Sequence, residues 1–155
     1  MTTPDTPSIS RDEERQLATD LFNHVWELLE TPSRTADQDE RMIHAAHASR
    51  FHWGNVGSPE NLAVGDWQCS RVYSVLERAE PALYHARRCL ERCEETGLEG
   101  FHPAEAFEAL ARAHLVAGEP GEAFRFERLA RGEAEKIEDA EEREILERDL
   151  ATLPR

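Results

Sequence analysis

The sequence predicts an all-α protein built from antiparallel helical hairpins. Apolar residues recur with helical spacing along almost the whole chain, and Gly or Pro residues fall between the periodic segments. No segment alternates apolar and polar residues over the length of a strand, and Val and Ile are scarce. A chain of 155 residues is long enough for one domain with its own core. We therefore expect a single helical domain over residues 11–155, after a leader, residues 1–10, that is expected to be disordered.

Seven helices are expected from the periodic segments and the residues that begin and end them. Ser10 followed by Glu13 forms a capping box, Ser58 before Pro59 marks another start, and Gly97 and Gly118 fit helix ends. The last helix is highly charged, which suggests a terminal helix with one face toward the domain and the other toward water. The expected ranges are 11–30, 37–53, 59–78, 81–97, 103–118, 120–137 and 139–153.

Composition narrows the classes of partner. The net charge is −14, and a strongly acidic protein is a poor match for nucleic acid or an anionic membrane, which both require a cationic face. No apolar stretch approaches the roughly 20 residues that span a bilayer. Residues 1–10 have no apolar core of a signal peptide, and the odd number of cysteines suggests free thiols. These features predict a soluble, cytoplasmic, acidic protein that binds a protein, a peptide or a small molecule.

The third and fourth expected helices can be laid over the fifth and sixth with one constant offset of about 41 residues. This offset places Gly118 where Glu77 lies. It also aligns small or aromatic positions, which are Ser70 with Ala111, Tyr73 with His114, Ala82 with Ala123, and Cys89 with Ala130. Small residues at these positions would let two helices approach closely, while larger neighbours fill the space beside them.

The second of these pairs, with Leu110, Ala111, His114, Gly118, Ala123 and Ala130, resembles the tetratricopeptide repeat over residues 61–137. The repeat here is longer than the usual 34 residues, and the first large aromatic position of the family is unfilled in both pairs. The resemblance implies a right-handed solenoid of about seven helices with a C-terminal capping helix. An ordinary helical bundle is the alternative fold.

The same resemblance implies a ligand-binding surface. In tetratricopeptide proteins the first helix of each pair lines a concave groove, which would place Trp67 and Arg71 beside Glu108 and Arg112, with Gln68 adjacent. Arginines could hold an anionic ligand or a peptide carboxylate, and the indole could serve as a platform. The alternative is that Glu108 and Arg112 form a solvated intrahelical ion pair and that Trp67 belongs to the core. The expected function is a binding or scaffold module that recognises a peptide or a small anionic ligand.

A histidine cluster suggests a second function. His44 and His47 are spaced i, i+3 on the second expected helix, close enough to chelate a transition metal ion, and His52 could join if the helix ended early. No carboxylate stands beside them in the local sequence, and buried histidines satisfied by hydrogen bonds are the simpler interpretation. We further expect His44 and His47 to face the same cavity as Arg71 and Arg112. The alternative function is thus a metal-binding protein or a metal-dependent enzyme.

His85, Cys89 and Cys93 form another stripe at i, i+4 spacing, but they continue an apolar face with Ala82 and Ala86 and are predicted to be core residues. The chain carries no complete catalytic motif, so its sequence does not indicate a reaction.

Overall fold

The computed structural model describes residues 8–154. These residues form seven α-helices and no strand, which confirms the all-helical class, the number of helices and their order. The expected leader, residues 1–10, lies largely outside the described part of the chain. The helices are α1 (Arg11–Glu30), α2 (Ala36–Val56), α3 (Pro59–Val75), α4 (Ala79–Thr96), α5 (Phe101–Val116), α6 (Pro120–Ala134) and α7 (Ala140–Ala151).

The first three helices begin with capping boxes. The Ser10 hydroxyl accepts a hydrogen bond from the Glu13 backbone N–H at 3.1 Å, and the Glu13 carboxylate accepts one from the Ser10 N–H in return. Thr35 and Gln38 form the same arrangement before α2, and Ser58 and Asn61 form it before α3. Each box satisfies backbone N–H groups that have no partner within the helix.

Only α1 has its predicted range, and the other helices differ from theirs by one to three residues at one or both ends; α3 and α6, for example, each end three residues early. Helix α2 continues past Trp53 to Val56, because Gly54 only weakens a helix while its N–H still joins the hydrogen-bond ladder. The chain leaves the helix at Gly57, whose N–H donates to the Trp53 carbonyl at 2.7 Å. Helix α5 begins at Phe101 rather than at Pro103. Pro103 fits in the first turn, where its missing N–H would have had no partner.

The turns that end α3 and α5 have the same backbone conformation. Glu77 has φ 58° and Gly118 has φ 76°, and both values lie in the left-handed region. The two residues are separated by the 41-residue offset found in the sequence. Glycine adopts this conformation without a steric penalty, whereas a residue with a Cβ does not. The two turns are therefore equivalent in geometry, although only one of them has the favoured residue.

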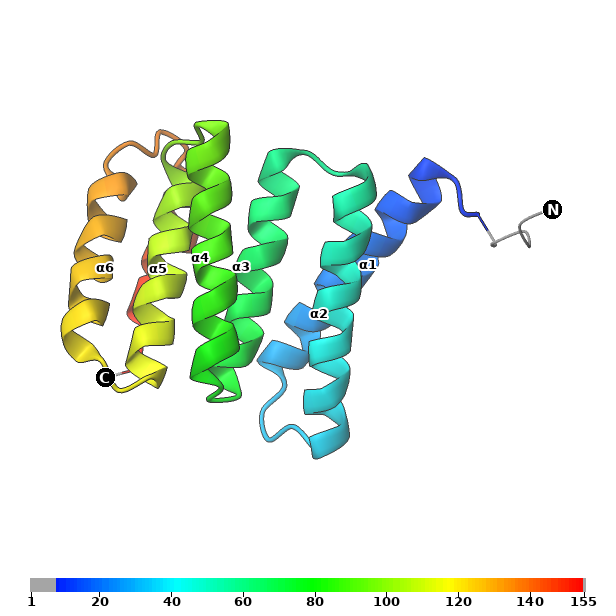
Figure 1. The fold of residues 1–155 in the computed structure, drawn as a ribbon, viewed down its shortest axis with the longest axis horizontal. Coiled ribbons are helices and arrows are strands. Elements are labelled where there is room, and N and C mark those ends of the chain that lie inside the picture. Colours follow the sequence, from blue (N-terminus) through cyan, green and yellow to red (C-terminus); the bar gives the residue numbers. More distant parts are fainter. Residues whose placement is uncertain (1–7, 155) are drawn as a thin grey trace.

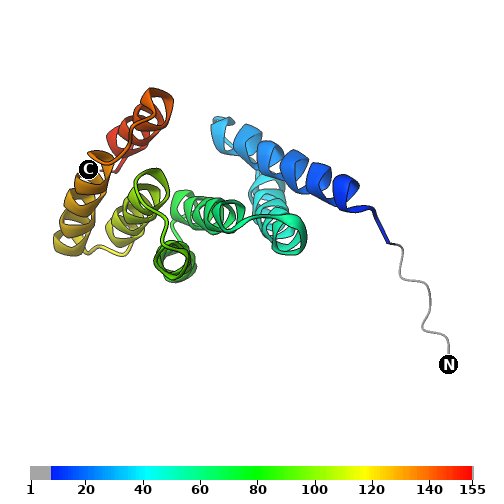
Figure 2. The same ribbon diagram turned by 90° about the horizontal axis from the view of Figure 1, so that it is seen from above.

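Consecutive helices pair as hairpins, α1 with α2, α3 with α4 and α5 with α6 (Figure 1). The hairpins are joined through contacts of α2 with α3, of α4 with α5 and of α3 with α5, and α7 packs mainly on α5. Viewed from above, α1 and α7 lie on the same side of α3 and α5 (Figure 2). Helices α3 and α5 thus form a floor, and α1 and α7 stand at its two sides.

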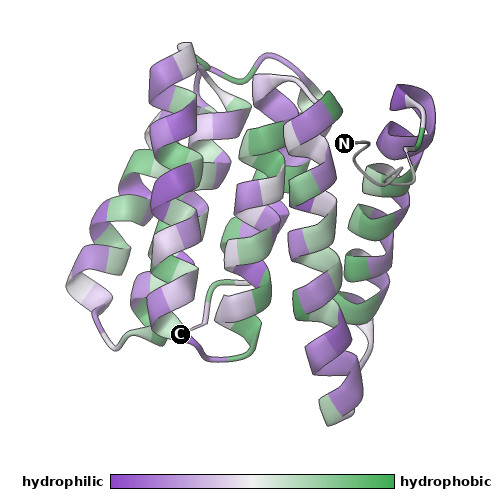
Figure 3. Cartoon of the chain, turned by 45° about the vertical axis from the view of Figure 1, so that its right-hand side comes forward, coloured by the Kyte–Doolittle hydropathy of each residue, from purple (hydrophilic) through white to green (hydrophobic). Residues whose placement is uncertain are grey.

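Each helix in view carries both hydrophilic and hydrophobic segments, as expected for helices that bury one face (Figure 3). The aligned small residues of the repeat are buried, at no more than 3% exposure: Ser70, Ala82, Cys89, Ala111, Ala123 and Ala130. Ser70 shows how close two helices come, because its hydroxyl on α3 donates to the Ala82 carbonyl on α4 at 2.8 Å. The small residues therefore lie where helices pack, as the sequence predicted.

Helices α2, α3 and α4 are also tied by a buried carboxylate. Asp66 on α3 accepts a hydrogen bond from Arg50 Nε of α2 at 2.7 Å and another from Arg92 Nε of α4 at 3.0 Å. A carboxylate with two guanidinium partners can remain charged while only 5% exposed. This contact holds the first hairpin against the second.

Candidate functional site

A pocket of about 480 Å³ lies over the floor formed by α3 and α5, between α1 and α7. Its walls are largely apolar. Aromatic side chains come from three helices, with Phe22 and Trp26 on α1, Trp67 on α3 and Phe101 on α5, and the Trp26 and Trp67 rings are 5.6 Å apart. The volume falls in the range of pockets that hold small ligands.

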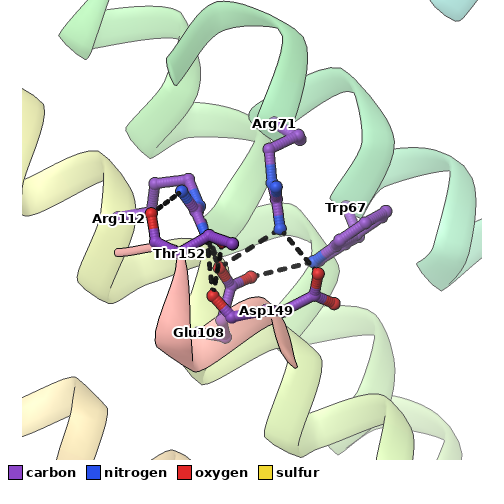
Figure 4. A network of polar contacts seen from close by, with 6 residues as sticks. All are labelled: Trp67, Arg71, Glu108, Arg112, Asp149 and Thr152. Atoms are coloured by element: carbon purple, nitrogen blue, oxygen red, sulfur yellow. Dashed lines mark hydrogen bonds and ion pairs between the residues drawn. The ribbon is translucent and has the colours of Figure 1, made fainter. Parts of the chain in front are cut away.

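Trp67 and Arg71 line this pocket, while Glu108 and Arg112, which the repeat alignment brought to them, are buried next to them and do not line it. Trp67 Nε1 donates to Glu108 Oε2 at 3.2 Å across the 41-residue offset, and Arg112 Nε donates to Glu108 Oε1 at 2.8 Å on the same helix (Figure 4). Arg71 Nη2 lies 3.5 Å from Glu108 Oε1, and its guanidinium group lies over the Trp67 ring at 5.2 Å. The predicted set of Trp67, Arg71, Glu108 and Arg112 is therefore one connected group.

Helix α7 completes this group with two residues that the sequence did not single out. Asp149 Oδ1 accepts from Arg71 Nη2 at 3.0 Å, and Arg112 Nη2 donates to the Asp149 carbonyl at 2.9 Å and to the Thr152 hydroxyl at 2.8 Å (Figure 4). Asp149 belongs to a long acidic run, so its spacing gave no signal that distinguished it from solvated neighbours. We refer to Trp67, Arg71, Glu108, Arg112, Asp149 and Thr152 as the polar cluster.

The remaining predicted site residue points elsewhere. Gln68 is buried, and its amide donates to the Phe22 carbonyl at 3.0 Å, so it ties α3 to α1 and does not line the pocket.

The pocket also contains an acid that the sequence did not single out. Glu105 lies one turn before Glu108 on α5 and lines the pocket. Glu105 follows Pro103 in the first turns of a helix, where acidic residues are common, so its type and place carried no signal.

Glu105 is the least satisfied polar side chain at the pocket. It is 6% exposed, and neither carboxyl oxygen has a hydrogen-bond donor of the protein within reach. Burial, followed by repulsion from Glu108 and Asp149, raises the pKa of Glu105 well above its ordinary value. The Asp149 carboxyl is within hydrogen-bonding reach, but two carboxyl groups can share a hydrogen bond only when one of them keeps its proton.

Burial also shifts the charged members of the polar cluster. It raises the pKa of Asp149 and lowers the pKa of Arg112, although Glu108 opposes the second shift. Both arginines nevertheless have carboxylate partners at hydrogen-bonding or ion-pair distance. Within the polar cluster, the Nε–H of Arg71 is a buried donor that has no hydrogen-bond acceptor.

The three histidines proposed as metal ligands each have a different neighbour. His44 is exposed, with Nε2 3.6 Å from Glu40 Oε1; His47 Nε2 lies 2.8 Å from the Tyr73 hydroxyl; and His52 Nδ1 lies 3.1 Å from Glu14 Oε1. Within residues 8–154, no group of three or more His, Cys, Asp or Glu side chains is placed to hold a metal ion.

The expectation that His44 and His47 share the cavity of Arg71 is wrong, because neither lines the pocket. Helix α2 packs behind α3, on α1 and α3, so His47 meets the side of α3 that carries Tyr73.

His47 belongs instead to an aromatic group at the junction of α2, α3 and α4. Its ring lies 5.2 Å from that of His85, which stacks on Tyr73 at 5.7 Å. Burial lowers the pKa of His47 and, together with repulsion from His47, lowers the pKa of His85 to about 4. These imidazoles are neutral at pH 7 and act as packing groups.

The cysteines are core residues. Cys69, Cys89 and Cys93 are free and buried, as expected for Cys89 and Cys93 from their apolar stripe. Cys69 Sγ lies 4.0 Å from His47 Nδ1, but burial raises the pKa of its thiol to about 12. A thiol that keeps its proton at pH 7 is a poor nucleophile.

Compared with models of known protein families, with curated protein sequences and with solved structures, the chain gives no significant match. No helix in the described part of the chain is long and apolar enough to cross a membrane. The pocket and the polar cluster are therefore the features from which a function can be proposed.

Proposed function

We propose that the protein is a binding module of the tetratricopeptide type, and that its ligand site is the pocket between α1, α3, α5 and α7. The observation that carries the proposal is an apolar pocket of about 480 Å³ with a buried polar group at its floor. Three further features support the repeat. They are the shared offset of 41 residues between Trp67 and Glu108, the buried small residues at the helix contacts, and the matching turns at Glu77 and Gly118.

The ligand is expected to be a small molecule or a peptide side chain with a hydrophobic body. Phe22, Trp26, Trp67 and Phe101 provide large apolar surfaces for such a body. From the sequence, two arginines on this surface suggested an anionic ligand. Arg71 and Arg112 are paired with Glu108 and Asp149, so their charge is already neutralised within the protein. A metal-dependent function of His44, His47 and His52 has no comparable support, because these side chains point to separate neighbours.

A neutral aromatic probe tests the location of the site without assuming a charge. We expect 3-phenylpropanol, titrated into isotopically labelled protein, to shift amide resonances of α1, α3, α5 and α7 around the pocket. Val64 lines the pocket, so Val64→Trp should fill it and abolish these shifts. Leu129→Trp is the matched control, because Leu129 is 40% exposed on α6 and does not line the pocket.

Binding by the wild-type chain and by Leu129→Trp, and its loss in folded Val64→Trp, would support the proposal. Shifts that are unchanged in Val64→Trp, or that map to the outer faces of α4 and α6, would contradict it. Absence of any binding up to the solubility of the probe would contradict it as well.

A further inference from the structure

We infer that the ligand of this pocket carries an organic ammonium group on its hydrophobic body, and that Glu105 is the residue that recognises this group. The inference rests on the proposed function, because it takes the pocket as the ligand site. It adds the chemical class of the ligand and a residue that specifies it.

The first argument is the charge balance at the pocket floor. The carboxyl groups of Glu105, Glu108 and Asp149 meet the guanidinium groups of Arg71 and Arg112, so there is one more acid than base. The two arginines pair with Glu108 and Asp149. Glu105 has no ion-pair partner among the described residues, so the two arginines balance this floor only while Glu105 is neutral, and an ionised Glu105 needs a further positive charge beside it.

The second argument is hydrogen bonding. Glu105 is 6% exposed and lines the pocket, yet neither of its oxygens accepts a hydrogen bond from the protein. The contact with the Asp149 carboxyl serves only a protonated acid, so an ionised Glu105 has no hydrogen-bond donor among the described residues and is unfavourable there. An ammonium group offers up to three N–H donors together with the missing charge. A ligand with a carboxylate at this point would instead add a fourth acid beside Glu105, Glu108 and Asp149.

The third argument concerns the kind of cation. The pocket walls are mainly apolar and aromatic, and Trp26 and Phe101 line the same pocket as Glu105. A strongly hydrated metal ion does not suit such walls, and the described side chains provide no metal site of three or more ligands. An alkylammonium group is weakly hydrated on its carbon side and is attracted to aromatic faces. The surroundings of Glu105 therefore favour an organic cation.

Charge state supports the same conclusion. Burial raises the pKa of Glu105 and so favours its protonated form. The charged and titratable groups around it come from every neighbouring wall, and they are Glu108, Arg112 and His102 on α5, Arg71 on α3, Asp149 and Arg148 on α7, and the exposed Glu30 on α1. Binding of an ammonium would stabilise the ionised carboxylate, so the Glu105 proton would leave to solvent as the ligand enters. Affinity for the ammonium should consequently rise with pH, while affinity for a neutral analogue should not.

Three probes with the same phenyl group test the inference in the full-length chain: 3-phenylpropylammonium, 3-phenylpropanol and 3-phenylpropanoate. Dissociation constants are measured by chemical-shift titration at pH 7. The ammonium should bind about tenfold more tightly than the alcohol, and the carboxylate more weakly than the alcohol. Glu105→Gln keeps the shape of the side chain and removes its charge, so it should reduce the ammonium preference to less than about twofold. Glu95→Gln, an equal charge change at an exposed position of α4 that does not line the pocket, should leave that preference nearly unchanged.

The outcomes separate the two proposals. Equal affinity for all three probes, or an ammonium preference that survives in Glu105→Gln, would overturn the inference while leaving the pocket as a ligand site. Tightest binding of the carboxylate would also overturn it, and would point to Arg71 or to Arg148 at the rim. No binding of any probe, including the alcohol, would mean that the proposed ligand site itself is wrong. Loss of the ammonium preference in Glu105→Gln, with normal alcohol binding, is the result we expect.

Discussion

Arg112 joins the floor of the pocket to the C-terminal helix, and its replacement tests the account of the polar cluster. The Arg112 residue is only 5% exposed. It donates to Glu108 Oε1 at 2.8 Å and to the Asp149 carbonyl, the Thr152 carbonyl and the Thr152 hydroxyl at 2.9, 3.2 and 2.8 Å. Arg112→Met keeps much of the side-chain volume and removes all of these donors.

We expect Arg112→Met to lower the free energy of unfolding by about 3–5 kcal/mol, because a buried carboxylate loses its closest cation. Arg71 Nη2 lies no closer than 3.5 Å to Glu108 Oε1, and it also pairs with Asp149. Arg71 therefore cannot replace Arg112. In the double variant Arg112→Met, Glu108→Gln the uncompensated charge is removed, and about half or more of the loss should be recovered. Trp67 can still donate to the amide oxygen of the introduced glutamine.

The assay is urea unfolding at pH 7, followed by circular dichroism and by tryptophan fluorescence. Coincident transitions are needed to interpret the midpoints as free energies. Arg88→Met is the control, since Arg88 pairs with Glu91 on the exposed face of α4 and should contribute less than about 1 kcal/mol. A change below about 1 kcal/mol in Arg112→Met, or a double variant that is less stable than Arg112→Met, would refute the view that Arg112 neutralises a buried acid.

Three further predictions concern the pocket acid and the repeat. Because the folded-state pKa of Glu105 is raised, its contribution to stability is full below its ordinary pKa near 4.5 and is lost as pH rises through the folded value. The stability of wild type relative to Glu105→Gln should therefore increase as pH falls from 7, by at most about 1.4 kcal/mol per pH unit, in urea titrations at several pH values; no pH dependence of the difference would contradict the shift. Glu77→Gly should raise stability, measured by calorimetry, by about 0.5–1 kcal/mol, because glycine adopts the left-handed φ of 58° without strain. The control Glu80→Gly, in the first turn of α4, should lower stability in the same measurement. Ala123→Leu should cost about 1–3 kcal/mol by overpacking a position that is 3% exposed, and an unchanged melting temperature relative to the exposed-site control Arg87→Leu would argue against the proposed repeat register.

Local signals in the sequence determined the helices, and they predicted an offset of 41 residues between two hairpins. Capping residues such as Ser10 and Ser58 act on the N–H groups of their own first turn, so a short window is sufficient to recognise them. The 41-residue offset placed Trp67 beside Glu108 and Arg71 beside Arg112, because equivalent residues of neighbouring repeat helices face the same way. The same signals fixed the ends less well, as at Gly54, where the packing of α2 outweighs a weak helix breaker.

Only the tertiary structure decided what surrounds those residues. Whether Arg71 and Arg112 are free to hold an anion depends on α7, which brings Asp149 and Thr152 to them from more than thirty positions away along the chain. Whether His44 and His47 join the groove depends on which side of α3 receives α2. Glu105 became distinctive only once it was seen to be buried without a donor. Periodicity and spacing report which way a side chain points from its own helix, but the partner that it meets, and hence its charge state and its chemistry, depends on how distant helices pack.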